Sequence, residues 1–354
     1  MKMLKLSCNA IALFVQILLL IQWQLSMAVL ANHVPPKPAT HKPKRAPRTL
    51  PPEASLSSGY YAATCPNLEA IIQEKVQAWV NTDQTLAASL IRLHFHDCAV
   101  RGCDGSILLN YRGSERRAKA SRTLRGYAVI NDIKSEVERQ CHKTVSCADI
   151  LTAVARDATL IAGGPFWEVP FGRKDGRISI AREANRVVPQ GNENVTTLIN
   201  LFDRLGLNIL DLVVLSGAHT IGRSSCSSIH SRLYSFNGTQ GASDPSLDRK
   251  YLRTLKEECG PSSYFNTVVD LDATTPRIFD IAYYENLQKK MGLLLTDQSL
   301  YSDERSASFV DLMVSQPSLF FGQFAASMVK LGNVGVLTQP NEGEIRHQCD
   351  YVNP

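Results

Sequence analysis

The sequence predicts a mainly α-helical protein with long loops and short strands at most. After residue 56, apolar residues recur at i, i+3 and i+4 spacing, which is the pattern of amphipathic helices. The alternation of apolar and polar residues that is typical of strands is scarce. Of the 354 residues, 44% are hydrophobic and 20% are charged, so the chain has enough apolar material for a large core and too little charge for a disordered protein.

Residues 1–31 have the composition of a secretory signal peptide. Two lysines precede an apolar run from Ile11 to Ile21, and cleavage is expected after Ala28 or Ala31. The run is too short for a membrane-spanning helix, and no later segment reaches the roughly 18 apolar residues that a span needs. The sequence therefore predicts a secreted protein without a membrane anchor.

Residues 32–55 form a basic, proline-rich extension. Between Asn32 and Pro52 there are seven prolines and five Lys or Arg residues but no acid, a composition that cannot build a core. We interpret the segment either as a spacer or trimmed propeptide, or as a cationic arm that binds an acidic polymer such as cell-wall polysaccharide. Seven of the 38 basic residues lie in 1–52, which leaves 31 against 33 acids in the remainder. That balance argues against nucleic-acid binding by the folded part.

Six helices are predicted from the apolar periodicity, and several of their ends carry matching signals. Ser146, Asn194 and Asn208 each precede a periodic run as N-cap residues, and the pair Gly163-Gly164 follows one as a stop. The predicted helices are 68–80, 86–100, 127–137, 147–162, 195–205 and 209–221.

The cysteines predict disulfides in an oxidising compartment. One of the nine, Cys8, leaves with the signal peptide, and the eight that remain can form four bridges. Spacing alone indicates only the pair Cys98 and Cys103, because eight cysteines allow 105 pairings. Asn194 and Asn237 begin glycosylation sequons, which is weak support for secretion.

The densest group of chemically active side chains lies at 91–98. Arg92 and His96 are spaced i, i+4 on the predicted helix, so they share one face beside Phe95. A charged donor and a general base are costly on an apolar face unless they act on something. A zinc hydrolase site built from His94 and His96 is excluded, because i, i+2 residues on a helix face apart.

The residues that follow supply hard oxygen ligands of the kind that bind Ca²⁺. Cys98 and Cys103 pinch a short loop with two carboxylates, a hydroxyl and backbone carbonyls. We interpret the loop either as a Ca²⁺ site or as a polar turn closed by a disulfide. The candidate ligands are Asp97, Val100, Gly102, Asp104 and Ser106.

A second histidine, His219, ends the apolar helix predicted over 209–221. Three small residues precede it, which lets a flat, bulky group approach the helix closely. One histidine on each of two separated helices, together with a distant acid, is a pattern suited to a haem with one proximal ligand and one distal base.

Seven motifs in order carry a resemblance to a known family. They are RLHFHDC (92–98), VRGCDGS (100–106), VSCADI (145–150), GRKD (172–175), LSGAHTIG (215–222), TP with FD (275–280) and TDQ (296–298). From about Leu56 to Asn353 the chain resembles the plant secretory (class III) haem peroxidases. The resemblance implies a fold over 56–354 with helices above and below one haem b, very little strand, and two Ca²⁺ ions.

The resemblance also implies roles for single residues. His219 would be the axial ligand of the haem iron, and Asp297 would accept its Nδ1 hydrogen. His96 would be the distal acid and base, and Arg92 the distal cation. Pro170, in the pair Val169-Pro170, matches the family proline whose carbonyl helps hold small phenols.

Metal ligands and disulfides follow in the same way. The distal Ca²⁺ would use the five oxygen ligands of the loop 97–106, and the proximal Ca²⁺ would use a second set. The implied proximal ligands are Thr220, Asp272, Thr275, Ile278 and Asp280, and the implied bridges are Cys65 with Cys141, Cys98 with Cys103, Cys147 with Cys349, and Cys226 with Cys259.

Two departures from the family pattern stand out. Family members place an Asn, bonded to the distal histidine, on the loop after the distal Ca²⁺ site, but 115–122 contains no Asn. Ala120 or Ser121 takes that place, and only Ser121 has a hydroxyl to substitute. We therefore hypothesise a weaker base at His96 and slower peroxide activation. The usual Asn after Asp280 is replaced by Ile281.

The resemblance implies a peroxidase that uses H₂O₂ to oxidise phenolic donors by one-electron steps. Expected settings are cell-wall, lignin or phenolic metabolism, the oxidative stress response and H₂O₂ removal. A catalytically weakened wall-binding haem protein is the alternative. We expect a monomer in the apoplast or cell wall, with the vacuole as the other location, and neither nucleic acid nor membrane as a partner.

Overall fold

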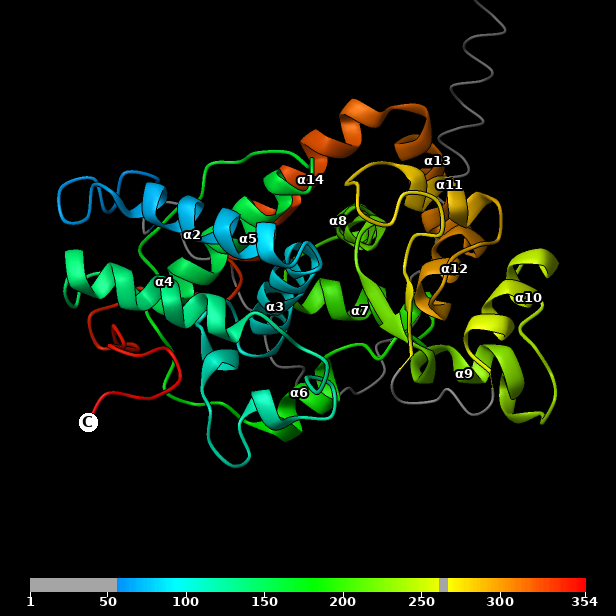
Figure 1. The fold of residues 1–354 in the computed structure, drawn as a ribbon, viewed down its shortest axis with the longest axis horizontal. Coiled ribbons are helices and arrows are strands. Elements are labelled where there is room, and N and C mark those ends of the chain that lie inside the picture. The colour runs from blue at the N-terminus through cyan, green and yellow to red at the C-terminus, as the bar shows by residue number, and fades with distance from the viewer. Residues whose placement is uncertain (1–55, 261–266) are drawn as a thin grey trace, which may run out of the picture. The chain divides into compact units, whose positions relative to one another are not determined.

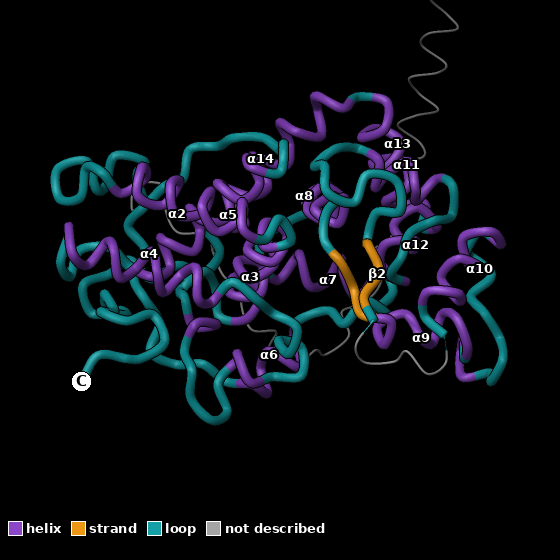
Figure 2. Tube along the Cα trace, viewed as in Figure 1, coloured by secondary structure: helices purple, strands orange, loops and turns teal. Residues whose placement is uncertain are grey.

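The computed structural model describes residues 56–260 and 267–354. The predicted signal peptide and the proline-rich extension lie outside the described residues. In the described part helix succeeds helix, and the one sheet is a pair of short antiparallel strands, so the predicted mainly α-helical fold is confirmed (Figure 1, Figure 2). No helix in this part is long and apolar enough to cross a membrane.

All six predicted helices are present, and the three predicted caps form. The Ser146 hydroxyl accepts from the Asp149 backbone N–H at 3.1 Å, and the Asn194 and Asn208 side chains accept in the same way three residues downstream. These bonds satisfy N–H groups that have no partner within the helix. The helices are α2 (Leu68–Thr82), α3 (Leu86–Val100), α4 (Tyr127–Gln140), α5 (Cys147–Ile161), α7 (Val195–Arg204) and α8 (Ile209–Ser216).

Further short elements complete the fold. The strands β1 (Arg223–Ser225) and β2 (Val268–Asp270) pair with Arg223 opposite Asp270. The remaining helices are α6 (Ala181–Val187), α9 (Cys226–Tyr234), α10 (Arg249–Glu258), α11 (Ala282–Gln288), α12 (Leu295–Ser302), α13 (Glu304–Ser315) and α14 (Pro317–Gly332), and the 3₁₀ turns are η2 (Ser106–Leu108), η3 (Glu115–Arg117), η4 (Gly217–Thr220) and η5 (Phe236–Gly238).

One predicted helix ends earlier than expected. The α-helical part of 209–221 stops at Ser216 and continues as the 3₁₀ turn η4, which carries His219. The Tyr284 hydroxyl lies 3.1 Å from the Val213 carbonyl and 3.3 Å from the Val214 carbonyl, so it competes for the acceptors of the last α-helical turn. At Gly217 a Cβ atom would lie 2.3 Å from that hydroxyl, which only glycine avoids.

The core forms where α5 packs against α2, α3 and α4, and where α8 packs against α13 and α14. Apolar side chains from these helices are almost fully buried, and their removal from water is the main stabilising contribution. A smaller buried cluster joins α9 and α10 around the bridge between Cys226 and Cys259. The two histidines predicted to flank a haem therefore lie on separately packed helical segments.

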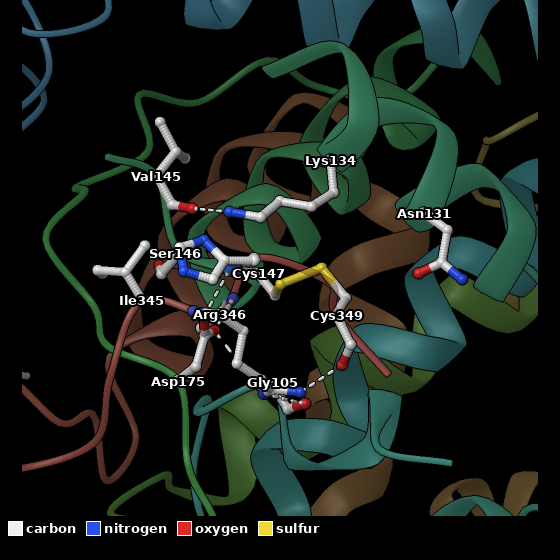
Figure 3. The surroundings of a disulfide bond; sticks show 12 residues. Gly105, Asn131, Lys134, Val145, Ser146, Cys147, Asp175, Ile345, Arg346 and Cys349 are labelled. Carbon is white, nitrogen blue, oxygen red and sulfur yellow. Dashed lines mark hydrogen bonds and ion pairs between the residues drawn. A yellow bond between two sulfur atoms is a disulfide. The ribbon is translucent and has the colours of Figure 1, made fainter. Parts of the chain in front are cut away.

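Four disulfides join the cysteines in the pairs that the resemblance implies, Cys65–Cys141, Cys98–Cys103, Cys147–Cys349 and Cys226–Cys259. Figure 3 shows the surroundings of Cys147–Cys349, which ties the start of α5 to the C-terminal segment. The buried Arg346 reinforces this link, because its backbone N–H donates to Asp175 at 2.9 Å and its guanidinium donates to the Cys349 carbonyl. The C-terminal segment is thus held by covalent and polar contacts together.

Candidate haem site

A cavity of about 850 Å³ brings the predicted catalytic residues together. Arg92 and His96 reach it from α3, and His219 reaches it from η4. Apolar side chains form much of its wall, as expected for a large flat cofactor. They include Ile91, Phe95, Leu198, Phe202, Leu212, Leu215, Ala218, Phe324 and Met328.

The proximal side is organised around a buried carboxylate. His219 Nδ1 lies 2.8 Å from Asp297 Oδ1, and the Tyr283 hydroxyl donates to the same oxygen at 3.2 Å. The Leu294 backbone N–H donates to the other oxygen at 3.0 Å, so Asp297 cannot rotate freely. Because Asp297 accepts the hydrogen of Nδ1, the lone pair of Nε2 remains available for a metal. The arrangement fits an axial iron ligand.

Tyr283 is kept protonated in this position. Burial raises the pKa of Tyr283 well above its ordinary value, and the negative charge of Asp297 raises that pKa further. The hydroxyl therefore remains a hydrogen-bond donor to Asp297 at physiological pH.

The distal side holds a neutral imidazole beside a permanent cation. His96 is only 3% exposed, and burial lowers the pKa of His96 well below its ordinary value, with the Arg92 charge as the second cause. The imidazole is therefore uncharged near pH 7 and can accept a proton. The Arg92 guanidinium donates to the Thr123 hydroxyl at 3.0 Å, which fixes its direction.

The place of the missing Asn is left without a hydrogen bond. Within 56–260 and 267–354, His96 Nδ1 and the buried Ser121 hydroxyl each lack a hydrogen-bond partner. Ser121 therefore does not bond directly to His96. Ala120 offers no side-chain group, and its backbone N–H donates to Asn185 Oδ1 at 3.1 Å.

His94 does not belong to this site. It is buried, and its ring nitrogens lie 3.7 and 3.8 Å from Cys98 Sγ. His94 and the sulfurs of Cys98 and Cys103 come close together, but the disulfide between these cysteines occupies the sulfurs. The geometry agrees with the exclusion of a zinc site built from His94 and His96.

Pro170 lies away from the cavity, which corrects the expectation for the donor-binding proline. Its carbonyl accepts a hydrogen bond from the Arg173 guanidinium, and it does not line the cavity. Two prolines line the cavity, Pro189 and Pro276, and only Pro189 follows a valine as the expected pair does. Within the described residues the dipeptide Val-Pro occurs twice, at 169–170 and 188–189, so local sequence alone did not distinguish the two.

The loop after α3 has the donor set of a Ca²⁺ site. The carboxylates of Asp97 and Asp104 are buried, and burial together with the Asp104 charge raises the pKa of Asp97 well above its ordinary value. Among the described residues the buried Ser106 hydroxyl has no hydrogen-bond partner. Two buried carboxylates and an unpartnered hydroxyl fit a hard cation. Asp97 also accepts the Gly105 and Ile107 backbone N–H groups, which shape the loop.

A second oxygen cluster lies next to His219. The Thr220 hydroxyl lies 3.1 Å from Asp272 Oδ2, 3.1 Å from Asp280 Oδ1 and 3.5 Å from the Ile278 carbonyl. The Thr275 hydroxyl lies 3.0 Å from the same Asp280 oxygen. Five oxygen atoms of the implied proximal ligands converge there, and such a set of oxygen donors fits Ca²⁺.

The replacement at Ile281 leaves this cluster intact. Its side chain packs against the hydrophobic core, and the neighbouring Ala282 backbone N–H donates to Asp280 Oδ1 at 2.8 Å. Asn286, which sequence reasoning missed, donates to Asp272 Oδ1 at 2.7 Å. The carboxylate of Asp272 is thus oriented from a helix that the motif pattern did not include.

Comparison with known proteins decides the family. A family model described as "Peroxidase" matches residues 72–316. Peroxidase 7 of Arabidopsis thaliana is 52% identical over 306 residues, which are 86% of each chain. Peroxidase 3 of the same plant is 45% identical over 86% of this chain and 94% of its own, and Peroxidase 1 of Oryza sativa subsp. japonica is 41% identical over 85% and 94%.

The chain belongs to the peroxidase family. The resemblance to the plant secretory peroxidases is confirmed, and the protein is a haem peroxidase that uses H₂O₂. The alternative, a catalytically weakened wall-binding haem protein, is not favoured.

Sequence reasoning missed four residues of this site: Thr123, Pro189, Tyr283 and Asn286. Only the pair Tyr283-Tyr284 had a usable signal, since two adjacent tyrosines follow closely on the proximal motif at 275–280. The others are single polar or proline residues in loops and on a short helix.

Proposed function

We propose that this peroxidase oxidises small phenolic donors, one electron from each of two donor molecules per H₂O₂. The supporting observation is the shared cavity, in which a neutral, buried His96 and the Arg92 cation lie in one space with the Asp297-bound His219. Haem b, when bound, supplies the redox-active iron. Two electrons and two protons from the donors, with one H₂O₂, give two molecules of water.

His96 and Arg92 have distinct roles in this proposal. His96 accepts a proton from H₂O₂ and delivers it to the leaving oxygen, because its imidazole is neutral at the start. Arg92 stabilises the negative charge that develops as the peroxide bond breaks. Replacing His96 by Ala should slow the reaction with H₂O₂ by about 10² to 10⁴ while haem remains bound. An unchanged rate in a haem-loaded variant would remove His96 from the mechanism.

His219 would hold the haem iron from the other side of the cavity, and Asp297 accepts its Nδ1 hydrogen. We assign donor contact to Pro189, which lines the cavity, in place of Pro170. Two Ca²⁺ ions would occupy the oxygen clusters around Asp97 and Thr220, each next to a catalytic histidine in sequence.

The setting belongs to the same proposal. The protein would be secreted to the apoplast or cell wall, with the vacuole as the alternative, and would act as a monomer. Asn194 and Asn237 are exposed, as glycosylation requires, and Asn194 also caps α7. The basic extension would bind acidic wall polysaccharide. Retention on a polyanion that vanishes with salt, and with deletion of 32–55, would support this role; equal retention after the deletion would refute it.

The decisive experiment is an absorption spectrum of the purified haem-loaded protein. One equivalent of H₂O₂ should shift the Soret band, and a simple phenol should then restore it. A Soret band that ignores H₂O₂ would show that the distal site does not work. A band that responds to H₂O₂ but is not restored by phenols would refute the donor class alone.

A further inference from the structure

Two histidines and a glutamate meet at the end of α4, outside the haem cavity. His142 Nδ1 lies 3.2 Å from Glu138 Oε2, and His347 Nδ1 lies 3.9 Å from the same oxygen. The two imidazole rings are nearly parallel, at an interplanar angle of 8° with centroids 5.7 Å apart. One carboxylate oxygen thus faces ring nitrogens from two segments that are far apart in sequence.

Contacts outside the cluster hold the Glu138 side chain and the backbone next to each histidine. The buried Lys134 donates to Glu138 Oε1 at 2.6 Å and to the Val145 carbonyl at 2.6 Å, which turns Oε2 toward the histidines (Figure 3 shows the contact with Val145). His142 follows Cys141, which is bridged to Cys65. The backbone on both sides of the cluster is therefore fixed without any ligand.

His347 is equally constrained. It lies between the buried Arg346 and the bridged Cys349, and its backbone N–H donates to Asn353 Oδ1 at 3.0 Å. Its Nδ1 atom is buried but has no hydrogen-bond partner among the described residues, because Glu138 is too far for a hydrogen bond. A buried ring nitrogen without a partner is costly unless something else satisfies it.

We propose that Glu138, His142 and His347 form a surface site for a divalent transition-metal ion of the Zn²⁺ class. Imidazole nitrogens and a carboxylate oxygen are the donors that Zn²⁺ takes, at about 2.0–2.2 Å each, which places ligand atoms roughly 3–3.5 Å apart. The pair His142 and Glu138 already meets this spacing. His347 is farther away: the three ligand atoms do not all lie within 4.8 Å of one another, so the partly exposed His347 imidazole must rotate toward both Glu138 and His142.

The site has an exposed side and a cationic neighbour, and both limit its affinity. The His142 side chain is 71% exposed, so water completes the coordination. The Lys134 ammonium neutralises part of the Glu138 charge, and one further bond, from the Lys143 backbone N–H at 2.9 Å, already uses Oε2. The ion would connect α4 to the C-terminal segment, in addition to the disulfide that joins this segment to α5.

Calorimetric titration of Zn²⁺ into the haem-loaded protein tests the proposal. The full secreted chain is used at pH 7.5 with excess Ca²⁺, so that neither the haem iron nor the Ca²⁺ sites compete. We expect the His142→Asn and His347→Asn variants each to weaken one Zn²⁺-binding event at least 10-fold. Zn²⁺ should also raise the Tm of the wild-type protein and not that of either variant.

His230→Asn is the matched control, because His230 lies on α9 beside Tyr234, far from Glu138 in the sequence. Any histidines of the basic extension are common to all the proteins compared. Unchanged Zn²⁺ affinity in both variants, or no Zn²⁺ binding by the wild-type protein, would overturn the site. Soret and far-ultraviolet circular dichroism spectra confirm that the variants are folded, and the readout does not depend on peroxidase activity.

Discussion

Ser121 is one of two residues that can take the place of the Asn that would hold the distal histidine, and its hydroxyl has no hydrogen-bond partner among the described residues. We therefore expect Ser121→Ala to leave the rate of reaction with H₂O₂ unchanged. Ser121→Asn should raise that rate by up to about 10-fold, because an amide oxygen that accepts from His96 Nδ1 makes Nε2 a stronger base. Stopped-flow absorption at the Soret band measures both.

The two possible alignments of the loop supply the control for this prediction. Ala120→Asn tests the neighbouring position, whose backbone N–H already bonds to Asn185. If Ala120→Asn raises the rate of reaction with H₂O₂ and Ser121→Asn does not, the place of the missing Asn is residue 120. A normal rate in the wild-type protein near neutral pH would refute the idea that its distal base is weak.

Tyr283 offers a test on the proximal side. Its hydroxyl is one of two donors found on the buried Asp297 carboxylate, beside the His219 contact. In Tyr283→Phe the carboxylate loses a donor and accepts more strongly from His219, so the imidazole becomes a stronger iron ligand. The midpoint potential of the haem iron should become more negative, on the order of tens of millivolts, since a hydrogen bond to a charged group is worth about 1.5–3 kcal/mol.

Tyr284→Phe is the matched variant, because the Tyr284 hydroxyl contacts carbonyls of α8 and not Asp297. It should leave the potential nearly unchanged while lowering stability. Equal potentials in Tyr283→Phe and the wild-type protein would mean that the Tyr283 bond does not influence the iron.

At the scale of elements, each oxygen cluster lies at the end of a segment that bears a catalytic histidine. Asp97 follows His96 directly, and Thr220 follows His219 directly. Without a cation, the closely spaced carboxylates at each cluster repel one another, and the adjacent segment should loosen. We expect a chelator to change the Soret band at concentrations that leave far-ultraviolet circular dichroism unaltered.

Added Ca²⁺ should restore the spectrum, and Mg²⁺ should do so poorly because it demands a smaller, more regular shell. A Soret band that stays constant until the helices themselves unfold would show that the clusters do not control haem geometry.

Local signals predicted elements well where a single segment carries its own determinants. The N-caps at Ser146, Asn194 and Asn208 depend on a side chain and an N–H group three residues away, and all three form. The early end of α8 depends instead on Tyr284, some seventy residues downstream. No periodicity within 209–221 records that contact, so the helix was predicted too long.

The same distinction explains the site. His96, Arg92 and His219 stand in distinctive motifs, and the cavity brings them together as expected. Pro170 and Pro189 share the same local dipeptide, and only the path of the chain selects Pro189. Asn286 and Tyr283 act across helices, so their roles appear only once α11 is packed.

At the scale of the whole molecule, the buried pair Arg156 and Asp157 in α5 links stability to pH. Arg156 Nε donates to Asp157 Oδ1 at 2.5 Å, and its guanidinium also pairs with Glu69 on α2. The other Asp157 oxygen is buried with no partner among the described residues. Burial raises the pKa of Asp157 to about 6, against the opposing effect of the Arg156 charge.

A carboxyl whose pKa is raised in the folded state favours folding when it is protonated. The unfolded chain ionises near pH 4 and the folded chain near pH 6, so this contribution is complete below about pH 4 and is lost as pH rises through about 6. Two units of pKa correspond to about 3 kcal/mol, which we take as an upper bound. Asp157→Asn carries no charge and removes this dependence.

Urea denaturation of the haem-loaded, Ca²⁺-saturated protein at pH 4.5 and 7.5 measures the effect. The free energy of unfolding of Asp157→Asn, relative to the wild-type protein, should rise by about 1–3 kcal/mol between the two pH values. Groups that titrate equally in both proteins cancel in this difference. Asp203→Asn, an exposed change on α7, should give the same difference at both pH values. If the unfolding free energy of Asp157→Asn, relative to the wild-type protein, is also the same at both pH values, the unpartnered oxygen of Asp157 is solvated. Asp157 then does not make the stability of the fold depend on pH.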